Sequence, residues 1–136
     1  MGRLIALDYG KKRTGIAETD DLQIIASGLT TVDTGDLFKF LVDYFKKHTV
    51  DAIILGEPKR LNGQDTHNTV PVKELQEKLS GTFGHIPVKM VDERFTSKMA
   101  FQTMIDSGLS KKKRQNKALV DEISATIILQ SYMSSL

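Results

Sequence analysis

The order of strand-like and helical patterns along the chain constrains its fold more than any other feature of the sequence. Two strand-like stretches, Leu4 to Leu7 and Thr14 to Thr19, flank a polar turn, and a third from Ile24 to Val32 follows after a second polar break. Strands this close in sequence are a hairpin signal, and the third completes an antiparallel meander. The first stretch is apolar at every position, which is typical of a strand buried on both faces.

After the meander the apolar residues recur with a helical period instead of alternating. They predict an amphipathic helix over about residues 37–45, with Asp33 or Thr34 placed to cap its start. Two further buried strands are expected at residues 52–56 and 88–91. The remaining helical patterns predict three more helices, at about residues 71–79, 96–107 and 119–133.

This order predicts one α/β domain that spans residues 1–136. A right-handed crossover after the meander returns the chain beside the first strand, so that the fourth and fifth strands lie parallel to it. We therefore expect a mixed five-stranded sheet, made of a three-stranded antiparallel meander and two parallel strands, with helices on both faces. In such a sheet the strand ends carry the ligand chemistry.

The composition of the chain excludes several classes of protein. Its 40% hydrophobic and 26% charged residues are typical of a folded globular domain. Because there is no cysteine, neither a disulfide framework nor a thiolate zinc site is possible. No signal peptide pattern occurs, and no apolar run approaches the roughly 20 residues that span a bilayer. A cytoplasmic protein without a membrane partner is expected, and the net charge of +2 is too small to indicate nucleic acid by itself.

Three acidic residues stand at the ends of apolar stretches. Asp8 closes the first strand, Glu93 follows the fifth strand, and Asp121 opens the last helix. A carboxylate where a buried strand surfaces is poorly suited to core packing, and three from distant parts of a small chain indicate one cleft that holds a divalent cation. Since strand side chains alternate, only one of Asp92 and Glu93 can point into that cleft, and we choose Glu93.

Each acid also has a plainer explanation. Asp8 can be a turn residue that bonds to its own backbone, and the glycines after it can cradle a phosphate, as in the hairpins of actin-type and sugar-kinase folds. Those folds duplicate the domain, however, and this chain is too short for that. Asp92 and Glu93 can form a charged helix cap. Asp121 can serve only to balance the dipole of the last helix.

Basic residues occur near each of the three acids. Beside a metal cleft such residues neutralise phosphates and raise affinity without reading sequence. Arg94 is expected to orient a phosphate or to hold a carboxylate, whereas the run before Asp121, read alone, is more often a solvated loop. The candidate nucleic-acid-binding residues are Lys11, Lys12, Arg13, Arg94, Lys111, Lys112, Lys113 and Arg114.

Three segments, at residues 7–17, 91–97 and 121–130, resemble the YqgF family, whose members are described as pre-16S ribosomal RNA nucleases or Holliday junction resolvases. The resemblance extends over nearly the whole chain. It implies a ribonuclease H-like fold, a bacterial cytoplasmic protein, and metal binding by the acids already singled out. One departure is Glu57, where the family usually has an apolar residue before proline. It can be an additional acid near the metal or a loop residue of this lineage.

The sequence therefore predicts a metal-dependent endonuclease that hydrolyses phosphodiester bonds in structured RNA and processes pre-16S ribosomal RNA. Asp8, Glu93 and Asp121 are the predicted catalytic and metal-binding residues, for one or two Mg²⁺ or Mn²⁺ ions that activate water. Two alternatives stay open: a resolvase that cuts four-way DNA as a dimer, and a non-catalytic module that binds nucleic acid or the ribosome. The expected oligomeric state is a monomer or a weak homodimer.

Overall fold

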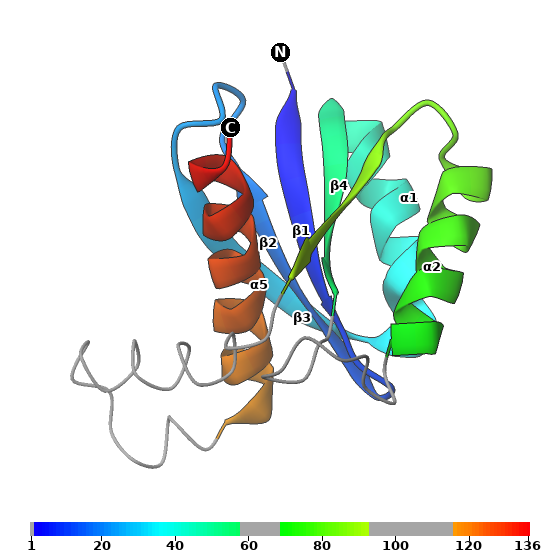
Figure 1. Cartoon of the computed structure of the whole chain (residues 1–136). Coiled ribbons are helices and arrows are strands. Elements are labelled where there is room, and N and C mark those ends of the chain that lie inside the picture. The colour runs from blue at the N-terminus through cyan, green and yellow to red at the C-terminus, as the bar shows by residue number, and fades with distance from the viewer. Residues whose placement is uncertain (1, 58–68, 93–115) are drawn as a thin grey trace.

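The computed structural model describes residues 2–57, 69–92 and 116–136, which contain one five-stranded sheet in the order β3-β2-β1-β4-β5 (Figure 1). β1 pairs antiparallel with β2 and parallel with β4, β2 pairs antiparallel with β3, and β4 pairs parallel with β5. The predicted combination of a meander and two parallel strands is thus confirmed. The strands are β1 (Arg3–Tyr9), β2 (Arg13–Thr19), β3 (Ala26–Asp33), β4 (Val50–Glu57) and β5 (Val88–Asp92).

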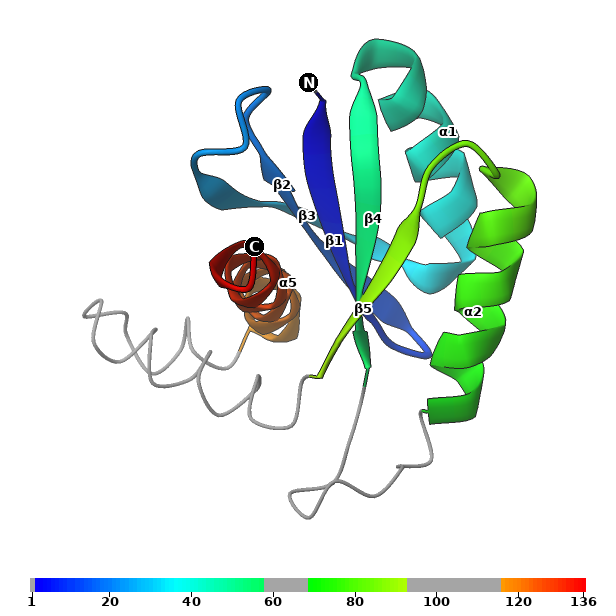
Figure 2. The same ribbon diagram turned by 45° about the horizontal axis from the view of Figure 1, so that its top comes forward.

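Helices cover both faces of the sheet, as Figure 2 shows. On one face lie α1 (Leu37–Lys47), which a 3₁₀ turn η1 (Thr34–Asp36) precedes, and α2 (Thr69–Thr82). The opposite face is crossed by α5 (Lys117–Ser134). The helix predicted at residues 96–107 falls outside the described residues. Within the described part of the chain, no helix is long and apolar enough to cross a membrane.

The face under α1 and α2 carries a core of large side chains. Ile5 and Leu7 of β1 point to this side and are fully buried. Phe83, just after α2, packs its ring against Phe38 and Phe45, with centroids 6.1 and 4.8 Å apart. Each fully buried aliphatic or aromatic side chain contributes about 1.5–3 kcal/mol, so this face is a main source of stability.

The face under α5 contains many small residues. Four large side chains are also buried there: Leu4, Ile54, Ile128 and Leu129. Ala6, Ala17 and Ala52, each from a different strand, belong to this second core. Ser124 and Ala125 are buried on the sheet side of the helix. Such short side chains let the helix backbone approach the strands closely. Ser131, seven residues after Ser124 in the same helix, is exposed.

One strand boundary differs from the prediction. Ile24 and Ile25 were expected in the third strand, but they lie in the loop before it, and both are 65% exposed. The Asp20 carboxylate accepts hydrogen bonds from their two backbone N–H groups, at 2.7 and 2.9 Å. Gln23 turns the chain with a positive φ of 56°. These N–H groups are used locally instead of in the strand ladder, so β3 begins only at Ala26.

The start of α1 also differs from the prediction. The helix is preceded by Asp36, whose side chain makes no capping hydrogen bond, and neither Asp33 nor Thr34 caps it. The Thr34 hydroxyl instead donates to the carbonyl of Gly10, and the Thr34 N–H donates to the carbonyl of Lys12 at 3.0 Å. These bonds connect η1 to the turn between β1 and β2.

Candidate functional site

Asp8 lies near the carboxyl end of β1, on the face that α5 covers. Leu4 and Ala6 belong to the core on that side, and side chains alternate along a strand, so Asp8 shares their face. Its cross-strand partner in β2 is Gly15. The parallel strands β1, β4 and β5 all end at this edge of the sheet. Asp8 is therefore where parallel strands usually carry their ligand chemistry.

The start of α5 packs directly on Gly15. A Cβ atom at this position would fall 2.0 Å from the carbonyl oxygen of Asp121 and 2.9 Å from the backbone nitrogen of Glu122. Glycine is required here because the backbone of the helix occupies the space that a side chain would need. Since Gly15 pairs with Asp8, this contact brings two of the predicted ligands, from distant parts of the sequence, to one end of the same face.

Arg13 connects β2 to the same turn of α5. Its Nε donates a hydrogen bond to Oδ2 of Asp121 at 3.1 Å, and the two side chains are 34% and 25% exposed. Arg13 shares the face of Gly15, which lies two residues further along the strand. Asp121 thus has a cationic partner within the protein. Arg13, which the sequence predicts to bind nucleic acid, also forms this internal ion pair.

Glu122 lies beside a different strand from its neighbour. A Cβ atom at Gly28 in β3 would fall 2.5 Å from Oε1 and 2.7 Å from Cγ of Glu122. The first turns of α5 therefore direct two consecutive acids to different surroundings. Asp121 meets Arg13 of β2, whereas Glu122 covers a glycine of β3, so the roles of the two carboxylates can be tested separately.

Two contacts fix the first turn of α5. The Asn116 side chain accepts the N–H of Leu119 at 3.2 Å, which is the usual bond of an N-cap residue. The Thr31 hydroxyl of β3 donates to the carbonyl of Ala118 at 2.6 Å. With this cap the helix begins at Lys117, earlier than the predicted start near residue 119.

The other predicted site residues divide into two groups. Lys11 and Lys12 are exposed in the turn between β1 and β2, next to Asp8 along the chain. Asp92 ends β5 two residues after Met90, which packs on the α1–α2 side, so alternation assigns it to the face opposite Asp8. The remaining predicted residues fall outside the described ranges: Glu93, Arg94, Lys111, Lys112, Lys113 and Arg114.

The donors at this edge fit a hard divalent cation. Asp8 and Asp121 are partly buried carboxylates, and carboxylate oxygens are the ligands that Mg²⁺ and Mn²⁺ prefer. Their partial exposure leaves room for water ligands, which Mg²⁺ usually keeps. Among the described residues, no group of three His, Cys, Asp or Glu side chains is close enough to hold a metal. A third protein ligand would therefore have to come from elsewhere in the chain.

The close contact between Gly15 and α5 was not among the predictions from the sequence. The signal was a glycine inside a strand, where it weakens pairing and often marks a close approach of another backbone. The pairing of Arg13 with Asp121 had no local signal, because it joins residues 108 positions apart.

The sheet and its helices define a RuvC-like fold of the ribonuclease H type. RuvC of T. thermophilus, solved in complex with a Holliday junction substrate, matches with a TM-score of 0.58 and 16% identity, over 98% of this chain and 95% of that chain. The resolvase of fowlpox virus, solved with Holliday junction DNA, gives a TM-score of 0.57 and 15% identity, over 98% and 97%. At these identities the likeness concerns the fold alone, and it confirms the predicted fold class.

The chain belongs to the RuvX family. The sequence pattern of that family, described as Holliday junction resolvase, matches residues 2–135. Relatives from Flavobacterium johnsoniae and Phocaeicola vulgatus are 59% and 57% identical over 135 residues, which is 99% of this chain and 98% and 97% of theirs. Both carry the name "Putative pre-16S rRNA nuclease". All of these names describe enzymes that hydrolyse phosphodiester bonds, so the predicted family and the nuclease class are confirmed.

Proposed function

We propose that this chain is a divalent-metal-dependent endonuclease that cuts structured RNA and trims the precursor of 16S ribosomal RNA in the cytoplasm. The packing of Asp121 on Gly15, the strand partner of Asp8, carries the proposal. This backbone contact supports the proposal, because it brings the residues that carry the two carboxylates to the same edge of a ribonuclease H-like sheet. The substrate is supported by the names of relatives that are 59% and 57% identical to this chain.

In the proposed mechanism Asp8 and Asp121 hold Mg²⁺ or Mn²⁺, and Glu93 supplies a third carboxylate. When bound, one or two such ions provide an activated water and neutralise charge on the leaving oxygen. The chain itself fixes the geometry, because Asp8 is part of a central strand and the first turns of α5 rest on the sheet. Arg13 balances the charge of Asp121 before the substrate binds.

The phosphate backbone of the substrate would be held by basic residues around this edge. Lys11 and Lys12 are exposed in the turn beside Asp8, which leaves their charges available to phosphates. Arg94 and the run from Lys111 to Arg114 are proposed to extend this contact. The protein would act on a ribosomal precursor as a monomer or a weak homodimer, since trimming one strand needs one site.

A second candidate function is the resolution of four-way DNA junctions. The description of the RuvX family favours it. This activity cuts two symmetric strands and therefore needs a dimer, whereas RNA trimming does not. A non-catalytic module is the third candidate, and it would bind nucleic acid or the ribosome without metal-dependent turnover.

Cleavage of labelled pre-16S RNA and labelled four-way DNA, with Mg²⁺ or Mn²⁺ and with a chelator, tests the proposal. We expect metal-dependent cuts in the RNA, loss of cleavage in Asp121→Asn, and largely retained cleavage in the matched control Glu122→Gln. Faster cutting of the DNA would favour the resolvase. Binding without cleavage of either substrate would favour the non-catalytic module, and equal losses in the two variants would mean that the wrong acid is assigned.

A further inference from the structure

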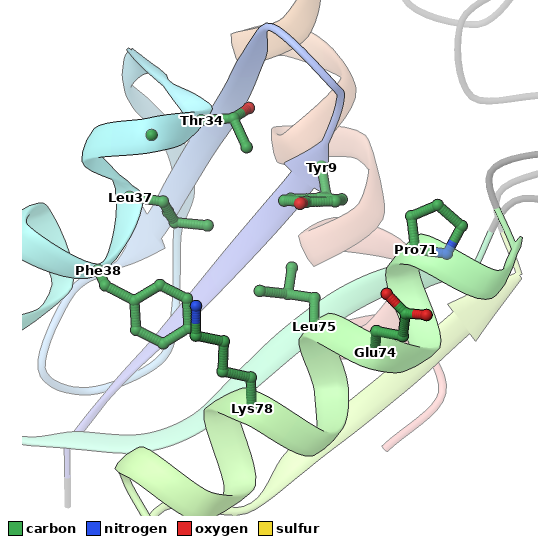
Figure 3. Close-up of a pocket in the computed structure, with 9 residues that line it drawn as sticks. Tyr9, Thr34, Leu37, Phe38, Pro71, Glu74, Leu75 and Lys78 are labelled. Atoms are coloured by element: carbon green, nitrogen blue, oxygen red, sulfur yellow. The ribbon is translucent and has the colours of Figure 1, made fainter.

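We propose that a pocket between α1 and α2 binds one nucleobase of the RNA strand that is cut. This inference rests on the proposed function, because it assigns a further contact to the same substrate. The pocket has a volume of about 320 Å³ and lies at the end of β1 (Figure 3). That volume is at the lower end of the range for small-ligand sites, about 300–1,000 Å³, and suits a single heterocycle.

The pocket adjoins the site but lies on the other side of the sheet. Tyr9 forms one of its walls and directly follows Asp8 in β1. Consecutive strand residues point to opposite faces, and Tyr9 packs with the core on the α1–α2 side. Their Cα atoms are only about 3.8 Å apart. An RNA strand that passes around the end of β1, with one phosphate near Asp8, can therefore place an adjacent base in the pocket on the α1–α2 side of the sheet.

The position of the pocket is fixed relative to the β1–β2 turn. Thr34, which lines the pocket, donates through its hydroxyl to Gly10 and through its N–H to Lys12. The hydroxyls of Thr34 and Thr14 also share a hydrogen bond of 3.0 Å. Since these partners belong to the hairpin that carries Asp8, the pocket and that carboxylate form one rigid arrangement. A preformed pocket lowers the entropic cost of binding.

The lining suits a flat ring with polar edges. Tyr9 and Phe38 provide aromatic rings, and the side chain of Leu75 projects from α2 toward them (Figure 3). Lys78 and Glu74 are exposed on α2, and Nζ of Lys78 lies 4.8 Å from the centroid of the Phe38 ring. Single-stranded RNA is commonly bound by stacking its bases on such rings and by hydrogen bonds to their edges. Lysine can donate to a ring carbonyl, and glutamate can accept from an exocyclic amino group.

Other occupants fit this chemistry less well. A phosphate would be attracted by Lys78 but repelled by the carboxylate of Glu74. An aliphatic side chain of a protein partner would use the apolar walls and leave both charged groups unused. A nucleobase uses the rings, the donor and the acceptor together.

Two glycines of the chain provide matched variants. Gly35 lines the pocket, whereas Gly81 lies in α2 and does not line it. At both positions an added Cβ would meet nothing within 4 Å, so neither side chain is forced against the backbone. Gly35→Leu is expected to fill the pocket, and Gly81→Leu adds the same group elsewhere. Both are made in an Asp8→Asn background, so that the RNA stays intact.

The probes are short single-stranded RNA oligonucleotides that carry fluorescent 2-aminopurine at each position in turn. We expect quenching at one position with the Asp8→Asn protein and with its Gly81→Leu form. In the Gly35→Leu form the quenching disappears and the affinity falls about 5- to 150-fold, which is the loss of one stacked base. Equal quenching and affinity in the two glycine variants would overturn the proposal.

The same materials separate this inference from the proposed function. Wild-type rates of RNA cleavage by the Asp8→Asn protein would defeat the assigned carboxylate site, while a difference in quenching between the glycine variants would still establish the base pocket. If Gly35→Leu in the wild-type background leaves metal-dependent cleavage unchanged, the pocket does not bind a base of the substrate. The proposal that the protein is a nuclease would still stand.

Discussion

The two faces of the sheet are built from side chains of very different size. Under α1 and α2, large aliphatic and aromatic groups fill the space, and Ile5, Leu7 and Leu79 are fully buried. Under α5, the strands present mainly alanine and glycine beside Leu4 and Ile54. The helix contributes the small residues Ser124 and Ala125 and, further along, the large residues Ile128 and Leu129. Large side chains keep a helix at a distance and remove much apolar area from water, whereas small ones let backbones touch. The α1–α2 face therefore supplies stability, and the α5 face fixes the position of α5 on the sheet.

This difference predicts that stability and activity will respond separately to mutation. On the α1–α2 face, a side chain truncated deep in the core leaves a cavity but does not displace the carboxylates of Asp8 and Asp121. On the α5 face, a single added methyl group displaces the helix that carries Asp121. The changes below test this division, from the largest expected effect to the smallest.

Asp8→Asn should lower the rate of RNA cleavage by about 100-fold or more, because it removes a ligand charge yet keeps the side-chain volume. The fold should barely change. Thermal melts with and without Mg²⁺ should show less stabilisation by metal in the variant, since binding to the native state is weakened. Cleavage near the wild-type rate would end the carboxylate assignment.

Leu79→Ala should lower the free energy of unfolding by about 2–5 kcal/mol, because it opens a cavity in the large core. Leu79 is fully buried in α2, on the face opposite the carboxylates. Activity per folded molecule should therefore stay close to that of the wild type. Urea unfolding and cleavage assays at low temperature measure the two quantities. A fall in the activity of fully folded protein would show that the faces are coupled.

Gly15→Ala should give the opposite pattern, with a cost of about 1–3 kcal/mol from overpacking and a larger relative loss of cleavage. The new methyl group meets the carbonyl oxygen of Asp121, so α5 must move. The matched control is Gly81→Ala, a helix position with open space around it, where a gain of about 0.5–1 kcal/mol and full activity are expected. Similar results for both glycines would mean that the close contact between Gly15 and α5 does not affect cleavage.

Arg13→Gln should have the smallest effect on stability, below about 1 kcal/mol, because the ion pair with Asp121 is partly exposed. Removing the competing cation should tighten Mg²⁺ binding about two- to fivefold, while RNA binding weakens and depends less on salt. Calorimetry without RNA measures the first effect. Lys12→Gln removes the same charge from an exposed neighbour, so it is the control for the Mg²⁺ measurement. Weaker Mg²⁺ binding in the Arg13 variant would show that Arg13 prepares Asp121 instead of competing for it.

The order and direction of the strands could be predicted because each strand leaves a local pattern of apolar residues. The boundaries at Ile24 and at the start of α1 could not, since they depend on where side chains form hydrogen bonds. Asp20 takes the N–H groups that would have extended β3, and Thr34 bonds to Gly10 of the neighbouring turn instead of capping the helix.

The site was predictable only in part. Asp8 is marked by its position at the end of an apolar run, and Asp121 by its place before a helical run. Their proximity follows from packing, because α5 settles where Gly15 leaves room for its backbone. The pocket behind Tyr9 is harder still to foresee, since its lining comes from β1, η1, α1 and α2. Glu93, which the motifs single out, stays a prediction.

The ion pair between Arg13 and Asp121 closes a loop of 108 positions. Contacts between residues far apart in sequence form late in folding. The chain must lose conformational entropy to close the loop before the contact contributes favourable free energy. A molecule in which only the meander has formed already contains Asp8 and Arg13, but Asp121 is not yet beside them. We expect cleavage to return with the slowest phase of refolding, after the strand signal has recovered. Partly folded molecules would then be harmless to RNA.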